Sequence, residues 1–215
     1  MNSHAAWSVR EWQGAYCIYR EGEPVIRNDG EVLRLYSEAL ALAVVDELTR
    51  IGQGILFQMA CDYASLRARE NTLSFSIADA LKQDRFLQLL RSGNSGIRSL
   101  AMERAALLLS HLGLHAASMD HVKDYVQKQL VRLTLSQKVF LAHFSSFNLV
   151  FVPVLWYLQG ELSIQDLVEI VVILTWKLEC KSVEGEFFNQ AREQFAEDNR
   201  EYLCFLSLSL PADPA

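Results

Sequence analysis

The stretch that decides the fold is GEPVIRNDGEVLRLYSEALALAVVDEL, residues 22–48. Its first half alternates apolar and polar residues around Asn28-Asp29-Gly30, and Asp-Gly supplies the positive φ angles that a tight hairpin turn requires. Its second half begins at Ser37, a good helix N-cap, and continues with an apolar residue at every third or fourth position. The stretch therefore predicts a β-hairpin that leads directly into a helix.

The hairpin belongs to a longer strand-rich segment, residues 12–36, whose apolar runs are broken at Glu21-Gly22 and at Asp29-Gly30. Pro24 suits a strand start or an edge strand, because it has no backbone N–H to donate. We therefore predict a small antiparallel β module over residues 1–36.

Helical periodicity predominates from Ser37 onward, and glycines or capping residues separate the segments. After the Ser37 helix, which Gly52 and Gly54 end, the predicted helices cover 55–69, 76–90, 100–112, 120–133, 136–158, a segment starting at 163–166, and 183–206. We expect about five to seven helices in a bundle, so residues 37–215 form a helical domain and the fold class is α+β, mostly α.

Residues 139–160 contain no Lys, Arg, Asp or Glu, so this segment has two interpretations. A transmembrane helix is one of them. The segment also contains polar residues and a proline, which are costly in lipid: His143, Ser145, Ser146, Asn148 and Pro153. We therefore favour a central helix that its neighbours bury on all sides.

Composition and charge limit the function classes. The chain has 215 residues, of which 51% are hydrophobic and 21% charged, as in globular proteins, and its net charge is -6. An acidic protein is a poor match for nucleic acid, although a basic partner remains compatible. The four cysteines, Cys17, Cys61, Cys180 and Cys204, are widely spaced and are predicted to be free thiols in a reducing compartment.

The first twenty residues contain no continuous apolar core of the kind that a signal peptide has. We therefore expect a cytoplasmic protein in a bacterium, or a mitochondrial matrix protein in a eukaryote.

Motifs for catalysis are missing from the sequence. It has no phosphate loop, no GxSxG elbow and no GxGxxG, so we predict a protein that is not an enzyme and uses no cofactor. One alternative is a small helical metal-dependent enzyme that uses His111, His115 and His121. Gly113 interrupts the helical pattern between the first two of these histidines, which favours structural roles for them.

A candidate partner surface lies where an apolar helix gives way to an acidic one, because aromatic and charged residues are mixed there. The residues that we select for partner binding are Trp176, Glu179, Glu184 and Glu186. An ordinary helix junction is the alternative for these residues. A helical adaptor with an unrelated protein partner is a further alternative for the whole chain.

Taken in order, these segments resemble a known family, the assembly chaperones that hold the α subunit of the F-type ATP synthase catalytic head. The resemblance begins with Gly22, Pro24, Gly30, Ser37 and the run Ala39-Leu40-Ala41. It continues in LAMERAALLLSHLGL, residues 100–114, and in the helix pair of residues 136–170. It implies a β module followed by a helical client-binding body.

The chain departs from the family pattern at the start of the last helix, where it has TWKLECKSVEGEFF in place of a Gln followed by a Trp-Gly-Glu cluster. It therefore resembles a divergent member. The resemblance implies a non-enzymatic, monomeric chaperone without nucleotide. Such a protein would shield the interface of the unassembled α subunit until the catalytic head assembles.

Overall fold

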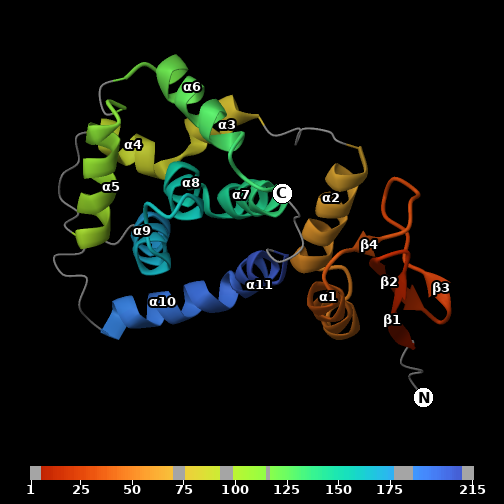
Figure 1. The fold of residues 1–215 in the computed structure, drawn as a ribbon. Coiled ribbons are helices and arrows are strands. Elements are labelled where there is room, and N and C mark those ends of the chain that lie inside the picture. The colour runs from red at the N-terminus through yellow and green to blue at the C-terminus, as the bar shows by residue number, and fades with distance from the viewer. Residues whose placement is uncertain (1–5, 70–75, 93–98, 115–116, 177–185, 210–215) are drawn as a thin grey trace. The chain divides into compact units, whose positions relative to one another are not determined.

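The computed structural model describes residues 6–69, 76–92, 99–114, 117–176 and 186–209, and it confirms the predicted class of a mostly helical α+β fold (Figure 1). Contacts group the chain into two compact units, neither of which is a contiguous segment. Unit 1 comprises residues 1–73, 134–140 and 200–215, and unit 2 comprises residues 74–133 and 141–199. The division of the chain after residue 36 stays a prediction.

A four-stranded antiparallel sheet opens unit 1 and consists of β1 (Trp7–Trp12), β2 (Ala15–Arg20), β3 (Glu23–Pro24) and β4 (Arg34–Leu35). Strand β2 pairs with the other three strands. The turn at Gln13-Gly14 and the predicted turn at Glu21-Gly22 both have two residues with positive φ, which suits the right-handed twist of a hairpin. The predicted strand segment began too late, because β1 starts at Trp7.

The predicted turn at Asn28-Asp29-Gly30 is confirmed. Ile26 and Val32 form a bridge, and the N–H of Arg27 donates to the carbonyl of Glu31 at 2.8 Å. Gly30 has a φ of 86°, so a glycine is favoured there.

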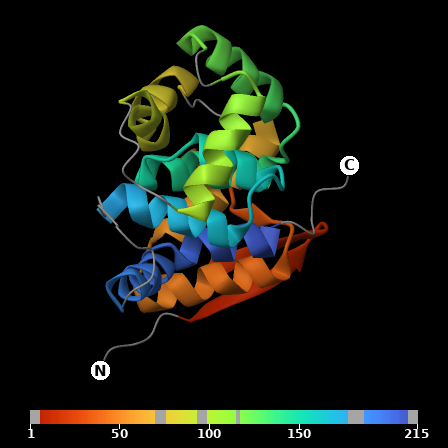
Figure 2. The same cartoon turned by 90° about the vertical axis from the view of Figure 1, so that its left-hand side faces the viewer.

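The remaining elements of unit 1 are helices α1 (Glu38–Arg50), α2 (Ile55–Arg69) and α11 (Arg200–Ser209). Ser37 caps α1 as predicted, and its Oγ accepts a hydrogen bond from the N–H of Leu40 at 3.2 Å. Helix α1 lies along the sheet, as Figure 2 shows. The rings of Tyr63 on α2 and Phe205 on α11 meet edge to face, with centroids 6.1 Å apart. Apolar side chains therefore join elements that are distant in sequence.

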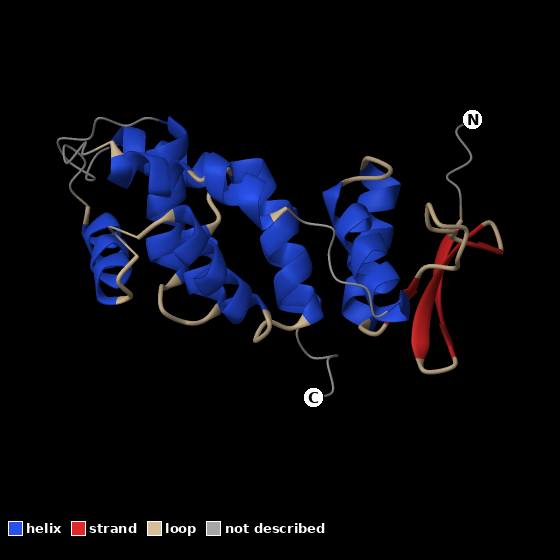
Figure 3. Cartoon of the chain, turned by 90° about the horizontal axis from the view of Figure 1, so that it is seen from above, coloured by secondary structure: helices blue, strands red, loops and turns tan. Residues whose placement is uncertain are grey.

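The described residues of unit 2 form helices joined by loops, without strands (Figure 3). Its helices are α3 (Ile77–Gln83), α4 (Arg85–Arg91), α5 (Leu100–His111), α6 (Met119–Leu130), α8 (Val152–Leu158), α9 (Ile164–Trp176) and α10 (Glu186–Asp198). Helix α7 (Leu135–Asn148) contributes residues to both units.

Several predicted helices were too long, so the described residues hold eleven helices in place of the five to seven expected. The helix predicted at 76–90 breaks at Asp84, the one at 136–158 breaks at 149–151, and the last one breaks at Asn199. The helix predicted at 120–133 starts earlier than expected and ends at Leu130, and Ser118 caps its start by accepting from the N–H of His121. By contrast, α2 has the predicted bounds.

Asp84 explains two of these breaks. Its fully buried carboxylate accepts from the N–H of Leu87 at 3.0 Å through Oδ1. Through Oδ2 it accepts from Phe151 at 2.8 Å and Val152 at 2.7 Å. One carboxylate thus caps the start of both α4 and α8, whose first N–H groups would otherwise lack acceptors.

The apolar segment 139–160 is therefore divided between α7 and α8. Within the described residues, every helix is too short or too polar to cross a lipid bilayer. The interpretation of this segment as one continuous central helix was wrong, although its side chains are largely buried as expected.

Candidate functional site

The predicted partner residues lie at the junction of α9 and α10. Trp176 is the last residue of α9 and Glu186 is the first residue of α10, while Glu179 and Glu184 fall outside the described residues. Helices α9 and α10 contact each other, so the two ends of the predicted surface belong to one helix pair. Partner binding by these four residues stays a prediction.

Helix α10 presents two different faces. Phe188, Ala191 and Phe195 are buried at a spacing of three and four residues, which is the pattern of an inward-facing stripe. The exposed residues of α10 include Glu193, Glu197 and Asp198, against one cation, Arg192. The outer side of α10 is thus acidic, mainly in the half of the helix away from the α9–α10 junction.

The histidines of the alternative metal site come from different elements. His111 ends α5 and His121 lies in α6, whereas His115 is outside the described residues. Among the residues whose positions are described, no three His, Cys, Asp or Glu side chains form a group that could hold a metal ion.

Cysteine chemistry is also disfavoured at the described positions. Burial raises the pKa of the Cys17 and Cys204 thiols, and it raises that of Cys61 to about 12. Because the thiolate is the nucleophilic form, these side chains are poorly reactive near neutral pH. These three are free thiols, as predicted, whereas Cys180 lies outside the described residues.

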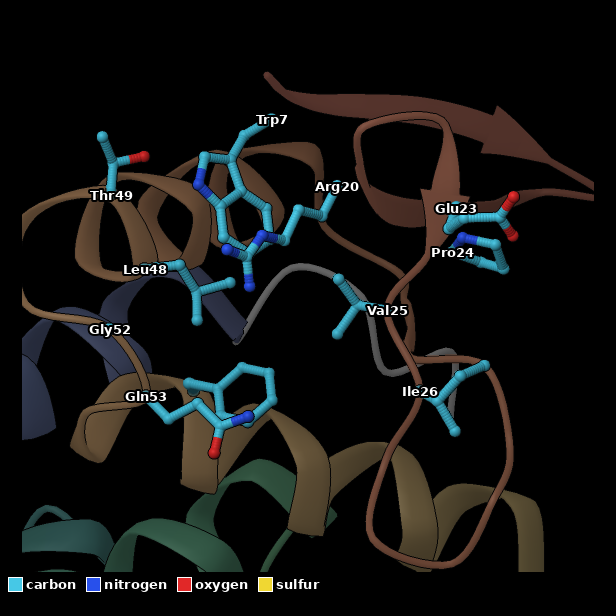
Figure 4. A pocket seen from close by; sticks show the side chains of 11 residues that line it. Trp7, Arg20, Glu23, Pro24, Val25, Ile26, Leu48, Thr49, Gly52 and Gln53 are labelled. Atoms are coloured by element: carbon cyan, nitrogen blue, oxygen red, sulfur yellow. The ribbon is translucent and has the colours of Figure 1, made fainter. Parts of the chain in front are cut away.

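A cleft of about 630 Å³ lies within unit 1, between the sheet and the turn that joins α1 to α2 (Figure 4). Its apolar lining comes from Trp7, Pro24, Val25, Ile26, Leu48 and Phe57. Its polar lining comes from Arg20, Glu23, Thr49 and Gln53. Polar and apolar groups share its exposed lining about equally, so the cleft is amphipathic.

Cross-strand pairing positions one wall of this cleft. Trp7 on β1 is directly opposite Arg20 on β2, and the Arg20 guanidinium lies 5.5 Å from the centre of a Trp7 ring. Figure 4 shows both side chains on the same side of the cleft as Leu48, with Val25 across from them. The stacking keeps the charged group over an aromatic surface, so the wall is both apolar and cationic.

A buried carboxylate positions the part of the wall that α1 and α2 contribute. Glu47 is 1% exposed, and its two oxygens accept from the N–H of Leu56 at 3.0 Å and of Phe57 at 2.7 Å. A Cβ atom at position 54 would collide with Glu47 Oε1, which is why Gly54 precedes α2. The α1–α2 turn is thereby held in one conformation, and Leu48 and Phe57 face the cleft from it.

The cleft was not among the sites predicted from the sequence. Its residues span positions 7 to 57 and come from strands, a loop and two helices, so no local spacing connects them. Gly54 was interpreted only as part of a helix end. Nothing in the sequence between Glu47 and Gly54 indicates that these two residues are in contact.

No protein-family model matches the sequence, and no curated protein matches it either. Among solved structures, the chain is similar to a point mutant of Paracoccus denitrificans Atp12p, with a TM-score of 0.59 and 14% identity over 95% of this chain and 96% of that one. The chain has the fold of Atp12. A second Atp12 structure from the same organism gives a TM-score of 0.56 at 13% identity, with the same shares of both chains covered.

The Atp12 fold accounts for the order in which the residues that carry the resemblance occur along the chain. The likeness covers nearly the whole of both chains, so it includes the N-terminal sheet as well as the helices that follow. The resemblance inferred from Gly22, Gly30 and Ser37 is thus confirmed at the level of fold, and the low identity fits a divergent sequence.

Proposed function

We propose that this protein is a non-enzymatic assembly chaperone for the α subunit of the F-type ATP synthase catalytic head. The observation that carries the proposal is the Atp12 fold over 95% of the chain. The ordered landmarks of residues 22–48 independently resemble the family of α-subunit chaperones, which supports the same function.

The proposed mechanism is the temporary covering of an interface. A free subunit exposes apolar surface that the finished assembly buries, and such surface promotes aggregation. A chaperone that binds the free subunit and yields to its native partner lowers the concentration of the aggregating species. The mechanism requires no bond-making step and no nucleotide.

Two surfaces are proposed to contact the client. The first is the α9–α10 junction with Trp176 and Glu186. The second is the cleft of unit 1, where Ile26 is 48% exposed and can be reached by a client side chain. The proposed compartment is the one in which the client assembles, namely the bacterial cytoplasm or the mitochondrial matrix of a eukaryote.

Affinity capture from the source organism tests the proposal. The tagged wild-type protein should retain the α subunit, and Trp176→Ala or Ile26→Asp should weaken this retention. Leu107→Asp is a matched control for Ile26→Asp, because Leu107 is 58% exposed on α5 and lies outside both proposed surfaces. Purified protein should also keep denatured α subunit in solution during refolding.

Absence of the α subunit from the wild-type eluate, together with no effect on its aggregation, would overturn the proposal. Specific capture of an unrelated protein by the wild type would support the adaptor alternative instead. Stoichiometric zinc or iron that is lost in His111→Ala would support the enzyme alternative.

A further inference from the structure

The outer face of the sheet in unit 1 carries arginines and aromatic residues. Cys17 on β2 is directly paired with Arg10 on β1 and with Arg34 on β4, so these three side chains form a row on one face. Trp12 and Tyr19 lie on the same face, two residues away from Arg10 and Cys17 along their strands. We call Arg10, Trp12, Tyr19 and Arg34 the arginine face.

The two faces of the sheet differ in what covers them. Ile18 and Leu35 on the opposite face are fully buried. On the arginine face, Cys17 and Ala15 are buried although Arg10 and Trp12 are exposed. The long side chains of the arginine face therefore cover the small residues beneath them, and they form the surface that a partner would meet.

Each arginine of this face is stacked on an aromatic ring. The guanidinium of Arg10 lies 4.5 Å from the centre of the Tyr19 ring, and that of Arg34 lies 4.3 Å from the centre of the Trp12 ring. Stacking restricts the guanidinium plane and leaves its N–H edges available for a carboxylate. Less conformational entropy is then lost when an anion binds.

A second hollow of about 510 Å³ continues from the arginine face, because Arg34 lines both. Arg67 and Tyr36 also line this hollow, and the Arg67 guanidinium lies 3.8 Å from the centre of the Tyr36 ring. Among the described residues that line it, one side chain is acidic, that of Glu31. Cationic groups outnumber acidic ones within this described lining.

Arg27 adds a buried charge to the lining of the same hollow. Its side chain is only 4% exposed and forms an ion pair with Asp29 at 3.2 Å. Within the described part of the chain, the Arg27 Nε atom has no hydrogen-bond partner. A buried guanidinium with an unsatisfied N–H favours a further negative charge nearby.

The composition of this surface distinguishes between classes of anionic partner. Arginine stacking already occupies one side of the Trp12 and Tyr19 rings, which limits the stacking of nucleic acid bases. The net charge of -6 also opposes binding to a long polyphosphate chain. A short segment of Asp and Glu residues would match the local positive charge and experience less repulsion from the rest of the protein.

We propose that the arginine face and the adjoining hollow form a docking surface for an acidic segment of a protein partner. The identity of that partner as the client rests on the proposed chaperone function. The site supplies guanidinium groups to the carboxylates of the segment, and the stacked rings contact its methylene groups.

Fluorescence anisotropy with a labelled short peptide rich in Asp and Glu tests this site in the full-length protein. We expect salt-sensitive binding, and the double variant Arg10→Gln/Arg34→Gln should weaken it by about tenfold or more. Arg50→Gln is the matched control, since Arg50 is an exposed arginine of unit 1 on α1 and is paired with Asp46 at 2.8 Å. The corresponding Asn and Gln peptide should not bind. Circular dichroism and thermal unfolding establish that each variant is folded.

The inference is overturned if the wild type does not bind the acidic peptide, or if the double variant binds it as tightly as the wild type. Tighter binding of an RNA oligonucleotide to the same face would also overturn it. Capture of the α subunit decides the proposed function separately. If the wild type and the double variant retain the α subunit equally well, the chaperone function stands and the arginine face is not where this client docks.

Discussion

Asn148 and Asn199 are 51 residues apart, and the Nδ2 of Asn148 donates a hydrogen bond to the Oδ1 of Asn199 at 2.8 Å. Both side chains are buried. Each amide also donates to the carbonyl four residues before it, Asn148 to Phe144 and Asn199 to Phe195. Asn148 is the last residue of α7 and Asn199 directly follows α10, so the pair joins two helix ends.

Replacement of Asn148 should destabilise the protein because the amide oxygen of Asn199 would lose its donor within the core. We expect Asn148→Ala to lower the free energy of unfolding by about 1–3 kcal/mol. Urea unfolding followed by circular dichroism measures this change. Asn189→Ala, at an exposed position of α10, should change it by less than about 0.5 kcal/mol. Equal effects of the two substitutions would contradict the role of the buried pair.

Removal of the Asp84 carboxylate should have a larger effect, since the N–H groups of Leu87, Phe151 and Val152 would all lose an acceptor. We expect a loss of about 3–5 kcal/mol for Asp84→Ala, measured by urea unfolding. Asp84→Asn keeps one acceptor oxygen and should cost less. Asp79→Asn is a suitable control, because the Asp79 side chain is 64% exposed. If Asp84→Ala is as stable as the wild type, the Asp84 carboxylate does not stabilise the starts of α4 and α8 as inferred.

The ion pair between Arg104 on α5 and Asp166 on α9, 2.9 Å apart, should make stability depend on pH. Partial burial alone would raise the pKa of Asp166, but hydrogen bonds from Ser163 and the charge of Arg104 outweigh it and lower that pKa. Because the folded-state pKa lies below the unfolded one, this contribution is present above about pH 4 and is lost as the pH falls through the folded-state value.

In Asp166→Asn, the free energy of unfolding should therefore fall less steeply as the pH is lowered below about 4. Urea unfolding at a series of pH values measures this dependence. Arg104→Gln keeps the carboxylate and the Ser163 hydrogen bonds, so its profile should lie between those of Asp166→Asn and the wild type. An acid profile of Asp166→Asn identical to that of the wild type would argue against this linkage.

Gly54 and Gly52 should respond differently to substitution by alanine. Gly54→Ala forces a methyl group against Glu47 and should cost about 1–3 kcal/mol. Gly52 has a φ of 83° with open space around it, so Gly52→Ala should cost about 1–2 kcal/mol through backbone strain alone.

A double-mutant cycle separates the two causes. Glu47→Ala should relieve part of the cost at position 54, giving a coupling of about 0.5 kcal/mol or more, and it should leave the cost at position 52 unchanged. Thermal unfolding of the single and double variants and the wild type measures both couplings. Equal coupling at the two glycines would mean that contact with Glu47 does not decide the effect.

Elements with local signals could be predicted from the sequence. Ser37 caps α1 and Ser163 caps α9 as their spacing suggested, and α2 has the predicted bounds because Gly54 precedes it. A cap needs only residues within one turn of a helix, so a single sequence contains the relevant information.

Breaks that depend on distant partners could not be predicted. Asp84 acts on Phe151 and Val152, 67 and 68 residues away, and nothing in the intervening sequence indicates this contact. Strand β1 was missed for a related reason. Its residues are exposed or only partly buried, so the alternation of apolar and polar positions is weak there.

The candidate sites also differ in whether a local sequence signal could reveal them. Trp176 and Glu186 were selected because aromatic and charged residues lie close together in the sequence, and their helices do meet. The cleft and the arginine face instead require the register of β1, β2 and β4, which places Arg10 and Arg34 on either side of Cys17. Cross-strand neighbours of this kind become visible only in three dimensions.

Unit 1 is built from both ends of the chain, and this has a consequence for the timing of folding. Helix α11 packs on α1 and α2, so the sheet and these helices must wait for residues 200–209 to leave the ribosome before their shared core can close. The intervening polypeptide can begin to organise earlier. We therefore expect residues 7–69 to complete their packing long after their own synthesis, with apolar surface left uncovered in the interval.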